Sequence, residues 1–360
     1  MDSNNSFNSI WTNESTLYTQ VYNFPNANRQ LLSREGRNLF ILVNHVILCS
    51  FISMFGVGAN SVNILVFLKQ GLKKSLNLCF FLLAVTDLMG LLTQLWHNFC
   101  LNPYVSYINA PLVFGEIQIL TAGKPNACLV RITGWITVYI TAERCLSIAM
   151  PLKIKQIVTF ERTALILLVI YLVNVASLVP LYFSAYFSWN FIPAKNTTFL
   201  GVSYRSNKQV IQDLLYIFQA SLALAAFACT VMFTSILIVS FKKNAEWRQK
   251  STFDSDQTKM KSKRENRTVR MVIVVACVLI VCYTPACVSS LVSAVIQDYS
   301  ITGRQSNIFE AVWSFGFLLH SVNSSINMVL YYRMSSKYKT IVQEMFPSCF
   351  KQNVLVQSKG

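Results

Sequence analysis

The chain has 360 residues, of which 53% are hydrophobic and 13% are charged. The charged share is about half that of an average soluble protein, so polar side chains are too few to cover soluble domains. This composition predicts a protein of the lipid bilayer and excludes a disordered regulator, a small disulfide-stapled module and an ordinary cytosolic enzyme. The net charge of +16 would suit nucleic-acid binding, but the basic residues lie between apolar runs, so we expect no nucleic-acid partner.

A helix needs about 20 mostly apolar residues to cross a bilayer. Seven stretches meet this need, at residues 39–68, 75–115 (a span with a short loop), 116–149, 163–194, 214–241, 271–297 and 311–332. The third is the most polar, but including it places most of the 31 basic residues on one side. The positive-inside rule assigns that side to the cytosol and the N-terminus to the outside.

We therefore expect an all-α membrane protein with three parts. An extracellular N-terminal segment (1–38) precedes a seven-transmembrane helix bundle (39–346), and a cytoplasmic tail (347–360) follows. After the last span, apolar residues at helical spacing predict a short amphipathic helix on the membrane surface. We expect a multi-pass protein of the plasma membrane.

Modification motifs agree with this orientation. Asn4, Asn13 and Asn196 stand in glycosylation sequons on the expected outer side. Cys349, which follows the expected amphipathic helix, is a candidate for palmitoylation.

Polar groups inside lipid-spanning helices are costly and usually face the interior of the bundle, where they mark function. In chain order, the polar motifs are Asn60, Asp87, Glu143-Arg144-Cys145, Cys282-Tyr283-Thr284-Pro285 and Asn323-Ser324-Ser325-Ile326-Asn327-Met328-Val329-Leu330-Tyr331.

These motifs, in this order on seven spans, resemble those of the rhodopsin-like (class A) G-protein-coupled receptors. The resemblance implies a receptor without catalytic activity that binds an extracellular ligand and activates a heterotrimeric G protein. Cys145, Tyr283 and Met328 replace the Tyr, Trp and Pro of the family motifs. The family disulfide between the outer end of span 3 and the second outer loop is missing, because residues 184–210 contain no Cys. With these departures, the sequence pattern resembles that of divergent invertebrate receptors of the chemosensory or peptide type.

The resemblance assigns a cytoplasmic switch to the inner ends of spans 3, 6 and 7. Arg144 needs a partner at the inner edge of the bilayer, and Glu143 is adjacent. Glu265 lies about five and a half helical turns before Pro285, which would bring it level with Arg144. We expect an Arg144–Glu265 pair to close the inactive bundle and Tyr331 to swing inward on activation. The alternative for the arginine is a side chain that snorkels to the lipid interface.

Pro285 removes one backbone hydrogen bond from span 6 and predicts a pivot there, next to Tyr283. A kinked helix suits an outward swing of its inner half.

A lone carboxylate at mid-bilayer, such as Asp87, should be either neutral or paired. The resemblance implies a polar network that includes Asn60 and a sodium ion held by oxygen atoms near Asp87. The other residues at matching positions are Thr133, Asn323, Ser324 and Asn327. The alternative is a protonated Asp87 in a network mediated by water.

The candidate ligand-pocket residues are His97, Asn126, Arg131, Glu310, Trp313 and His320. Asn126 stands where amine receptors of the family carry an Asp, which disfavours a biogenic amine. Arg131 would suit an anionic ligand or a peptide carboxylate, with a salt bridge or backbone contact as the alternative. A neuropeptide and a small chemosensory molecule both stay open as ligands.

A membrane transporter or channel is the alternative function. The seven spans show no internal repeat, and their charges form no continuous polar path. An enzyme is disfavoured because no metal-ligand spacing or catalytic constellation is present in the sequence.

Overall fold

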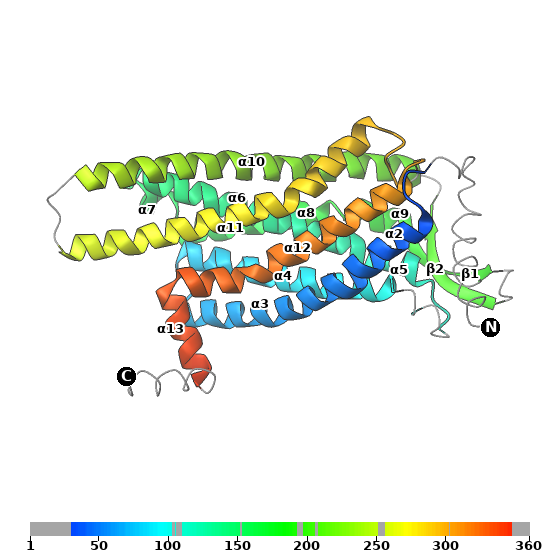
Figure 1. Cartoon of the computed structure of the whole chain (residues 1–360), viewed down its shortest axis with the longest axis horizontal. Coiled ribbons are helices and arrows are strands. Elements are labelled where there is room, and N and C mark those ends of the chain that lie inside the picture. Colours follow the sequence, from blue (N-terminus) through cyan, green and yellow to red (C-terminus); the bar gives the residue numbers. More distant parts are fainter. Residues whose placement is uncertain are drawn as a thin grey trace.

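The structure is a computed structural model that describes residues 30–102, 105, 110–151, 153–192, 197–205, 208–250, 256–301 and 303–347. In this part of the chain, seven long helical segments lie side by side in one bundle (Figure 1). A β-hairpin lies at one end of the bundle, and a short helix crosses the opposite end (Figure 1). The predicted seven-helix membrane fold is confirmed.

The segments follow the chain in order. The first comprises α2 (Arg34–Ile41), the π-helical η2 (Leu42–Cys49) and α3 (Ser50–Gln70), and the second is α4 (Ser75–Cys100). The third comprises α5 (Phe114–Gln118), the π-helical η4 (Ile119–Gly123) and α6 (Lys124–Ala149). After α7 (Ile154–Ile157), the fourth comprises α8 (Phe160–Ala176) and α9 (Val179–Ser184). The remaining segments are α10 (Lys208–Lys250), α11 (Asp256–Val295) and α12 (Ser306–Met334), and α13 (Ser336–Met345) is the short helix across the end.

Local sequence signals set several of the helix ends. The hydroxyl oxygens of Ser33, Thr159 and Ser335 each accept a hydrogen bond from a backbone N–H in the first turn of α2, α8 and α13. Gly71 ends α3 with a φ of 83°, a left-handed conformation that only glycine adopts easily. The chain can therefore turn sharply between α3 and α4.

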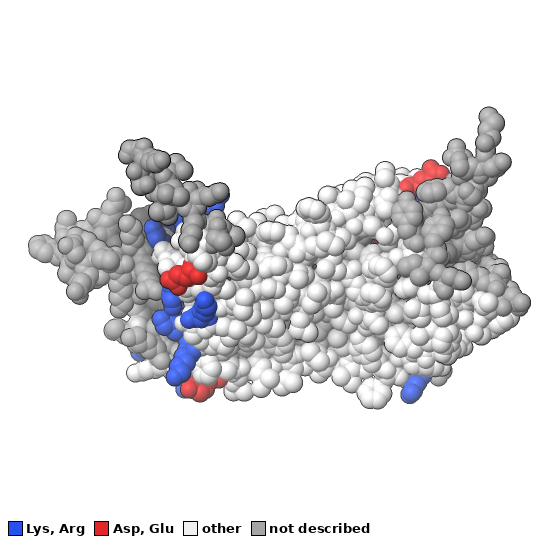
Figure 2. Space-filling view, turned by 90° about the horizontal axis from the view of Figure 1, so that it is seen from below, with Lys and Arg blue, Asp and Glu red and all other residues white. Residues whose placement is uncertain are grey.

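The bundle surface is apolar where lipid would surround it. Phe51, Val239 and Val281 expose 78%, 66% and 69% of their surface, whereas Asn60 and Asp87 are buried. In the described residues, five helical segments are long and apolar enough to span a membrane: Arg34–Gln70, Ser75–Cys100, Phe160–Ser184, Asp213–Asn244 and Asn266–Val295. Figure 2 shows an uncharged middle and a gathering of basic side chains at the end where α13 lies.

One large apolar core holds together the half of the bundle where α13 lies. It joins α3, α4, α6, α8, α10, α11, α12 and α13 through residues such as Leu83, Ile136 and Leu237, all almost fully buried. Tyr331 and Tyr338 belong to this core, although both carry a hydroxyl group. Helix packing in this half therefore includes α13, not only the seven spans.

The prediction that the fourth span extends to residue 194 is wrong. The helix ends at Ser184, and β1 (Ala185–Ile192) pairs antiparallel with β2 (Thr197–Tyr204). The β1 sequence is uncharged and mostly apolar, so it looks like a continuation of the preceding helix. A short apolar run does not by itself distinguish a strand from a helix.

The segment 242–270, which connects two of the predicted spans, is largely helical in the structure. α10 continues to Lys250 and α11 begins at Asp256, so both helices project beyond the apolar spans. Lys, Arg, Glu and Gln are good helix formers, and these helices can continue into water without an apolar face.

Candidate functional site

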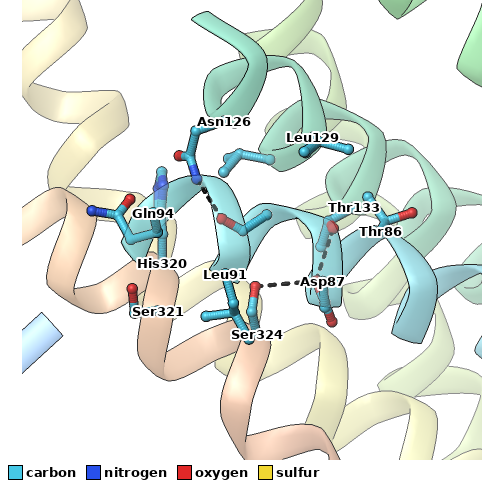
Figure 3. A pocket seen from close by; sticks show the side chains of 12 residues that line it. Thr86, Asp87, Leu91, Gln94, Asn126, Leu129, Thr133, His320, Ser321 and Ser324 are labelled. Carbon is cyan, nitrogen blue, oxygen red and sulfur yellow. Dashed lines mark hydrogen bonds between the residues drawn. The ribbon is translucent and has the colours of Figure 1, made fainter. Parts of the chain in front are cut away.

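Asp87 is the centre of a buried polar cluster between α4, α6 and α12. Its Oδ1 accepts hydrogen bonds from Thr133 Oγ1 at 2.9 Å and from Ser324 Oγ at 3.1 Å (Figure 3). Its Oδ2 accepts a hydrogen bond from Asn327 Nδ2 at 2.9 Å. The side chain is 1% exposed. Asn323 is also buried, but no hydrogen bond joins it to Asp87 among the described residues. Side chains of α6 and α12 therefore donate hydrogen bonds to one carboxylate of α4, which joins the middle parts of these three spans.

A small cavity adjoins Asp87 between α4, α6 and α12. Its volume is about 10 Å³, and its lining includes Asn126, Gln94 and His320 (Figure 3). Asn126 Nδ2 donates to the Gly90 carbonyl at 2.8 Å, which holds the side chain against α4. The predicted pocket residues Asn126 and His320 thus share one cavity with Asp87.

Asn60 connects the cluster to the first span and to α13. Its Nδ2 donates to the Ser324 carbonyl at 2.8 Å, and its Oδ1 accepts from Asn63 Nδ2 at 3.2 Å. Asn63 Oδ1 in turn accepts from the Tyr338 hydroxyl at 2.5 Å. A chain of hydrogen bonds therefore connects Tyr338 of α13, through two asparagines of α3, to Ser324, whose hydroxyl donates to Asp87.

At the inner end of α6, Arg144 pairs with its neighbour. Arg144 Nη2 lies 2.6 Å from Glu143 Oε1, and both side chains are largely buried. Glu143 Oε2 and Arg144 Nε are buried without a hydrogen-bond partner among the side chains that the structure describes. The backbone of Glu265 lies in α11, but its side chain is outside the described residues. The Arg144–Glu265 pair thus stays a prediction.

Tyr331 is buried among aromatic rings. Its ring is 5.4 Å from the ring of Phe67, 5.0 Å from that of Phe80 and 5.7 Å from that of Tyr338. Its hydroxyl is buried and has no partner in the described part of the chain. Inward movement of Tyr331 would exchange these ring contacts for new ones.

Pro285 lies within α11, which changes direction along its length (Figure 1). Close by, the Tyr283 hydroxyl donates to the Val130 carbonyl of α6 at 3.3 Å. The Tyr283 ring lies 4.5 Å from the ring of His320. The predicted pivot is thus in contact with α6 and α12 beside the small cavity.

The other predicted pocket residues lie nearer the outer end. His97 Nδ1 is 2.7 Å from Gln118 Oε1. Glu310 Oε2 lies 3.6 Å from Arg37 Nη1, which ties α12 to α2. Trp313 packs against Phe309 and Phe317, and its buried Nε1 has no partner among the described residues. None of these residues lines the Asp87 cavity.

Arg131 faces α8 rather than the Asp87 cavity. Its Nε donates to Asn174 Oδ1 at 3.4 Å and its Nη2 to Ser177 Oγ at 3.2 Å. No carboxylate pairs with it within the described residues, although it is buried. Its role in ligand binding stays a prediction.

The outer end of the third segment is attached to the hairpin without a disulfide. Glu116 Oε2 accepts a hydrogen bond from the Val202 backbone N–H at 2.8 Å. The Val113 N–H donates to the Leu200 carbonyl at 3.0 Å, and the Leu200 N–H donates to the Pro111 carbonyl at 2.8 Å. We call these contacts the hairpin clamp. They hold β2 near the position where the family disulfide would act.

Several interacting residues were missed by sequence reasoning. His45, Gln94 and Asn98 form a buried polar group in the outer half, where Gln94 Nε2 donates to Asn98 Oδ1 at 2.7 Å. The cost of polar groups in lipid could have identified them, because all three lie inside apolar runs. Asn63 had a similar signal, one helical turn after Asn60. The predicted modification residues Asn4, Asn13, Asn196 and Cys349 lie outside the described residues.

Comparison with known proteins adds a family and several relatives. The family described as "7 transmembrane receptor (rhodopsin family)" matches residues 59–331. Growth hormone secretagogue receptor type 1 of Sus scrofa is 23% identical over 298 residues, covering 82% of this chain and 78% of that protein. Neuromedin-U receptor 2 of Mus musculus is 22% identical over 324 residues, covering 83% and 74%. A neuromedin U receptor homolog of Caenorhabditis elegans is 23% identical over 357 residues, covering 89% and 84%.

Proposed function

Because the chain belongs to the rhodopsin family of seven-transmembrane receptors, we propose that it binds an extracellular peptide and activates a heterotrimeric G protein. It would do so at the plasma membrane, with its N-terminus outside. The observation that carries the proposal is the Asp87 cluster, in which one carboxylate joins α4, α6 and α12 between the outer and inner halves. A ligand that favours another arrangement of these helices shifts the population of the whole bundle.

The inner switch completes this mechanism. Arg144 is held by Glu143 at 2.6 Å, and the backbone of Glu265 is in α11. Separation of α6 from α11 would break the proposed Arg144–Glu265 pair and free that side of the guanidinium for contact with a G protein, whereas the Glu143 contact lies within α6. Pro285 lets α11 bend without breaking a backbone hydrogen bond, because proline has no N–H to donate.

The switch is tested by two variants with matched controls in cells that report G-protein activity. Glu265→Ala should raise ligand-free signalling, and Arg144→Ala should abolish signalling without loss of surface expression. Glu161→Ala and Arg162→Ala are the controls, since both residues begin α8 on the same side of the membrane. Unchanged basal activity of Glu265→Ala would argue against the lock, and solute flux without G-protein activation would favour a transporter.

The outer surface favours a peptide over a small chemosensory molecule. Phe187, Trp189 and Phe191 alternate along β1, so they share one face of the hairpin, and Trp189 is 60% exposed. Exposed aromatic side chains are typical anchors for peptide and protein ligands. The similar neuromedin U receptors are named for a peptide. An open aromatic face therefore fits a peptide that lies across the outer mouth.

A peptide library tested against a library of small odorants would decide between the two ligand classes. We expect a peptide response that Trp189→Ala weakens about tenfold or more, as for a binding hot spot. Asn190→Ala, on the opposite face of β1, is the matched control and should respond normally. Activation by odorants alone would contradict the peptide assignment.

We also propose that the Asp87 cluster can hold a sodium ion. Its residues fit that ion, because carboxylate and hydroxyl oxygens are the hard ligands that such cations prefer. The adjoining cavity has room for one small particle. Asp87, Thr133 and Ser324 would hold the ion, which would supply a positive charge to offset the buried carboxylate.

The proposed orientation places the three sequons outside the cell. Glycosylation at Asn4, Asn13 or Asn196 should make the protein shift in mass on treatment with a glycosidase. Palmitoylation of Cys349 should be removed by hydroxylamine. Absence of any glycan from protein at the cell surface would argue against the extracellular N-terminus.

A further inference from the structure

A second cavity lies at the opposite end of the bundle from the proposed peptide surface. It has a volume of about 120 Å³, enough for several water molecules. It opens between the inner ends of α3, α4, α11 and α12 and the start of α13. We call it the inner cavity. None of the residues assigned to ligand or sodium binding lines it.

The charge of the inner cavity has one sign. Lys74, Arg267 and Lys337 line it, and no Asp or Glu is in its described lining. The three cations come from α11, α13 and the residue before α4, so they approach the cavity from different directions. Asn77 and Ser335 add polar groups between them. Such a lining is suited to an anion that can accept several hydrogen bonds at once.

The inner wall of the cavity contains a second indication of a ligand. Tyr331 lines the cavity, and its buried hydroxyl has no hydrogen-bond partner among the described residues. A buried polar group without a partner is costly, and water or a ligand usually satisfies it. A hydroxyl group can donate to a phosphate oxygen.

The position of the cavity identifies the source of the anion. α13 begins directly after the last span and packs against α3 and α12 (Figure 1). A short amphipathic helix in this place is expected to lie in the headgroup layer of the bilayer. Basic side chains gather at this end of the molecule (Figure 2). Basic pockets between spans on the cytoplasmic side suit phosphorylated lipid headgroups.

We propose that the inner cavity binds the phosphorylated headgroup of an anionic phospholipid of the inner leaflet. Lys74, Arg267 and Lys337 contact its phosphate oxygens, and the Tyr331 hydroxyl donates a hydrogen bond to it. The headgroup then bridges α11 to α13 and to the start of α4.

The test uses the full chain in phosphatidylcholine nanodiscs that contain phosphatidylinositol bisphosphate. Bound lipid is counted by native mass spectrometry after release from the discs. The triple variant Lys74→Gln, Arg267→Gln and Lys337→Gln removes the cavity cations. The control, Lys69→Gln, Lys153→Gln and Lys339→Gln, removes three exposed cations from the same end of the bundle that do not line the cavity.

Each cavity cation removed should weaken lipid retention about fivefold, and all three about 100-fold. Tyr331→Phe, which keeps the ring, should weaken it about tenfold. The control variant should retain most of the lipid. Equal losses in the two triple variants would overturn the proposal, because they would show diffuse attraction to the surface. Full retention in the cavity variant would overturn it as well.

A parallel arm replaces the lipid with soluble inositol trisphosphate in lipid-free detergent. Binding in both arms supports the proposal and shows that the headgroup alone is recognised. Binding in the lipid arm alone also supports it and shows that the acyl chains contribute. Binding in neither arm, with variants that remain monodisperse and unfold at the wild-type temperature, refutes it.

Discussion

Replacing Tyr338 by Phe removes a single hydroxyl and should destabilise the protein although the ring stays in place. The hydroxyl donates to Asn63 Oδ1 at 2.5 Å, and both residues are almost fully buried. Burial raises the pKa of the Tyr338 phenol, so the group keeps its proton at neutral pH and remains a donor. The ring contacts with Phe67 and Tyr331, at centroid distances of 5.9 Å and 5.7 Å, do not depend on the hydroxyl.

The expected loss is about 1 kcal/mol. An unsatisfied buried acceptor costs about 1–3 kcal/mol in water-soluble proteins, whereas hydrogen bonds between membrane helices average about 0.6 kcal/mol. Tyr338 lies on α13 and Asn63 near the inner end of α3, so the pair lies between these two environments.

Thermal unfolding of the purified protein, followed with a thiol-reactive dye on its buried cysteines, measures this loss. A double-mutant cycle with Asn63→Ala isolates the pair, and its coupling energy should be about 1 kcal/mol. Tyr186→Phe, which alters an exposed tyrosine of β1, is the control and should unfold like the wild type. Additive effects of Tyr338→Phe and Asn63→Ala would refute the reasoning.

Three further predictions concern Gly56, Glu116 and Asp87. Gly56→Ala should cost about 1–3 kcal/mol, because a Cβ there would collide with Ser325 Oγ, whereas Gly58→Ala meets nothing within 4 Å and should unfold normally. Glu116→Ala should increase proteolysis of the hairpin in intact cells, because β2 loses one hydrogen bond of its clamp; unchanged cleavage would show that the backbone contacts suffice. Asp87→Asn should remove any dependence of ligand affinity on sodium concentration; an affinity that ignores sodium in the wild type would contradict the sodium proposal.

The polar centre of the bundle could be predicted from the sequence because of its cost. Asp87 and Asn327 stand out as polar residues in apolar runs, and lipid forces such groups to find one another. The structure brings both together with Thr133 and Ser324. The third span could be placed despite its polar residues because the distribution of basic loops requires it.

Other features depend on information that hydropathy does not contain. The uncharged stretch 163–194 predicts a span that continues through β1, because hydropathy alone does not indicate that β1 pairs with β2. The hydrogen bond that Tyr338 donates to Asn63 depends on the direction that the chain takes after Met334. Residue spacing within one helix cannot provide that direction.

The hairpin clamp has a consequence for the sensitivity of the protein to reducing agents. Its contacts are hydrogen bonds of Glu116 and of the backbone near Leu200 rather than a sulfur–sulfur bond. Thiol reductants inactivate proteins that depend on disulfides, but they should leave the hairpin clamp intact. Attachment of the hairpin by hydrogen bonds is instead readily reversible, because loops move on time scales of nanoseconds to microseconds.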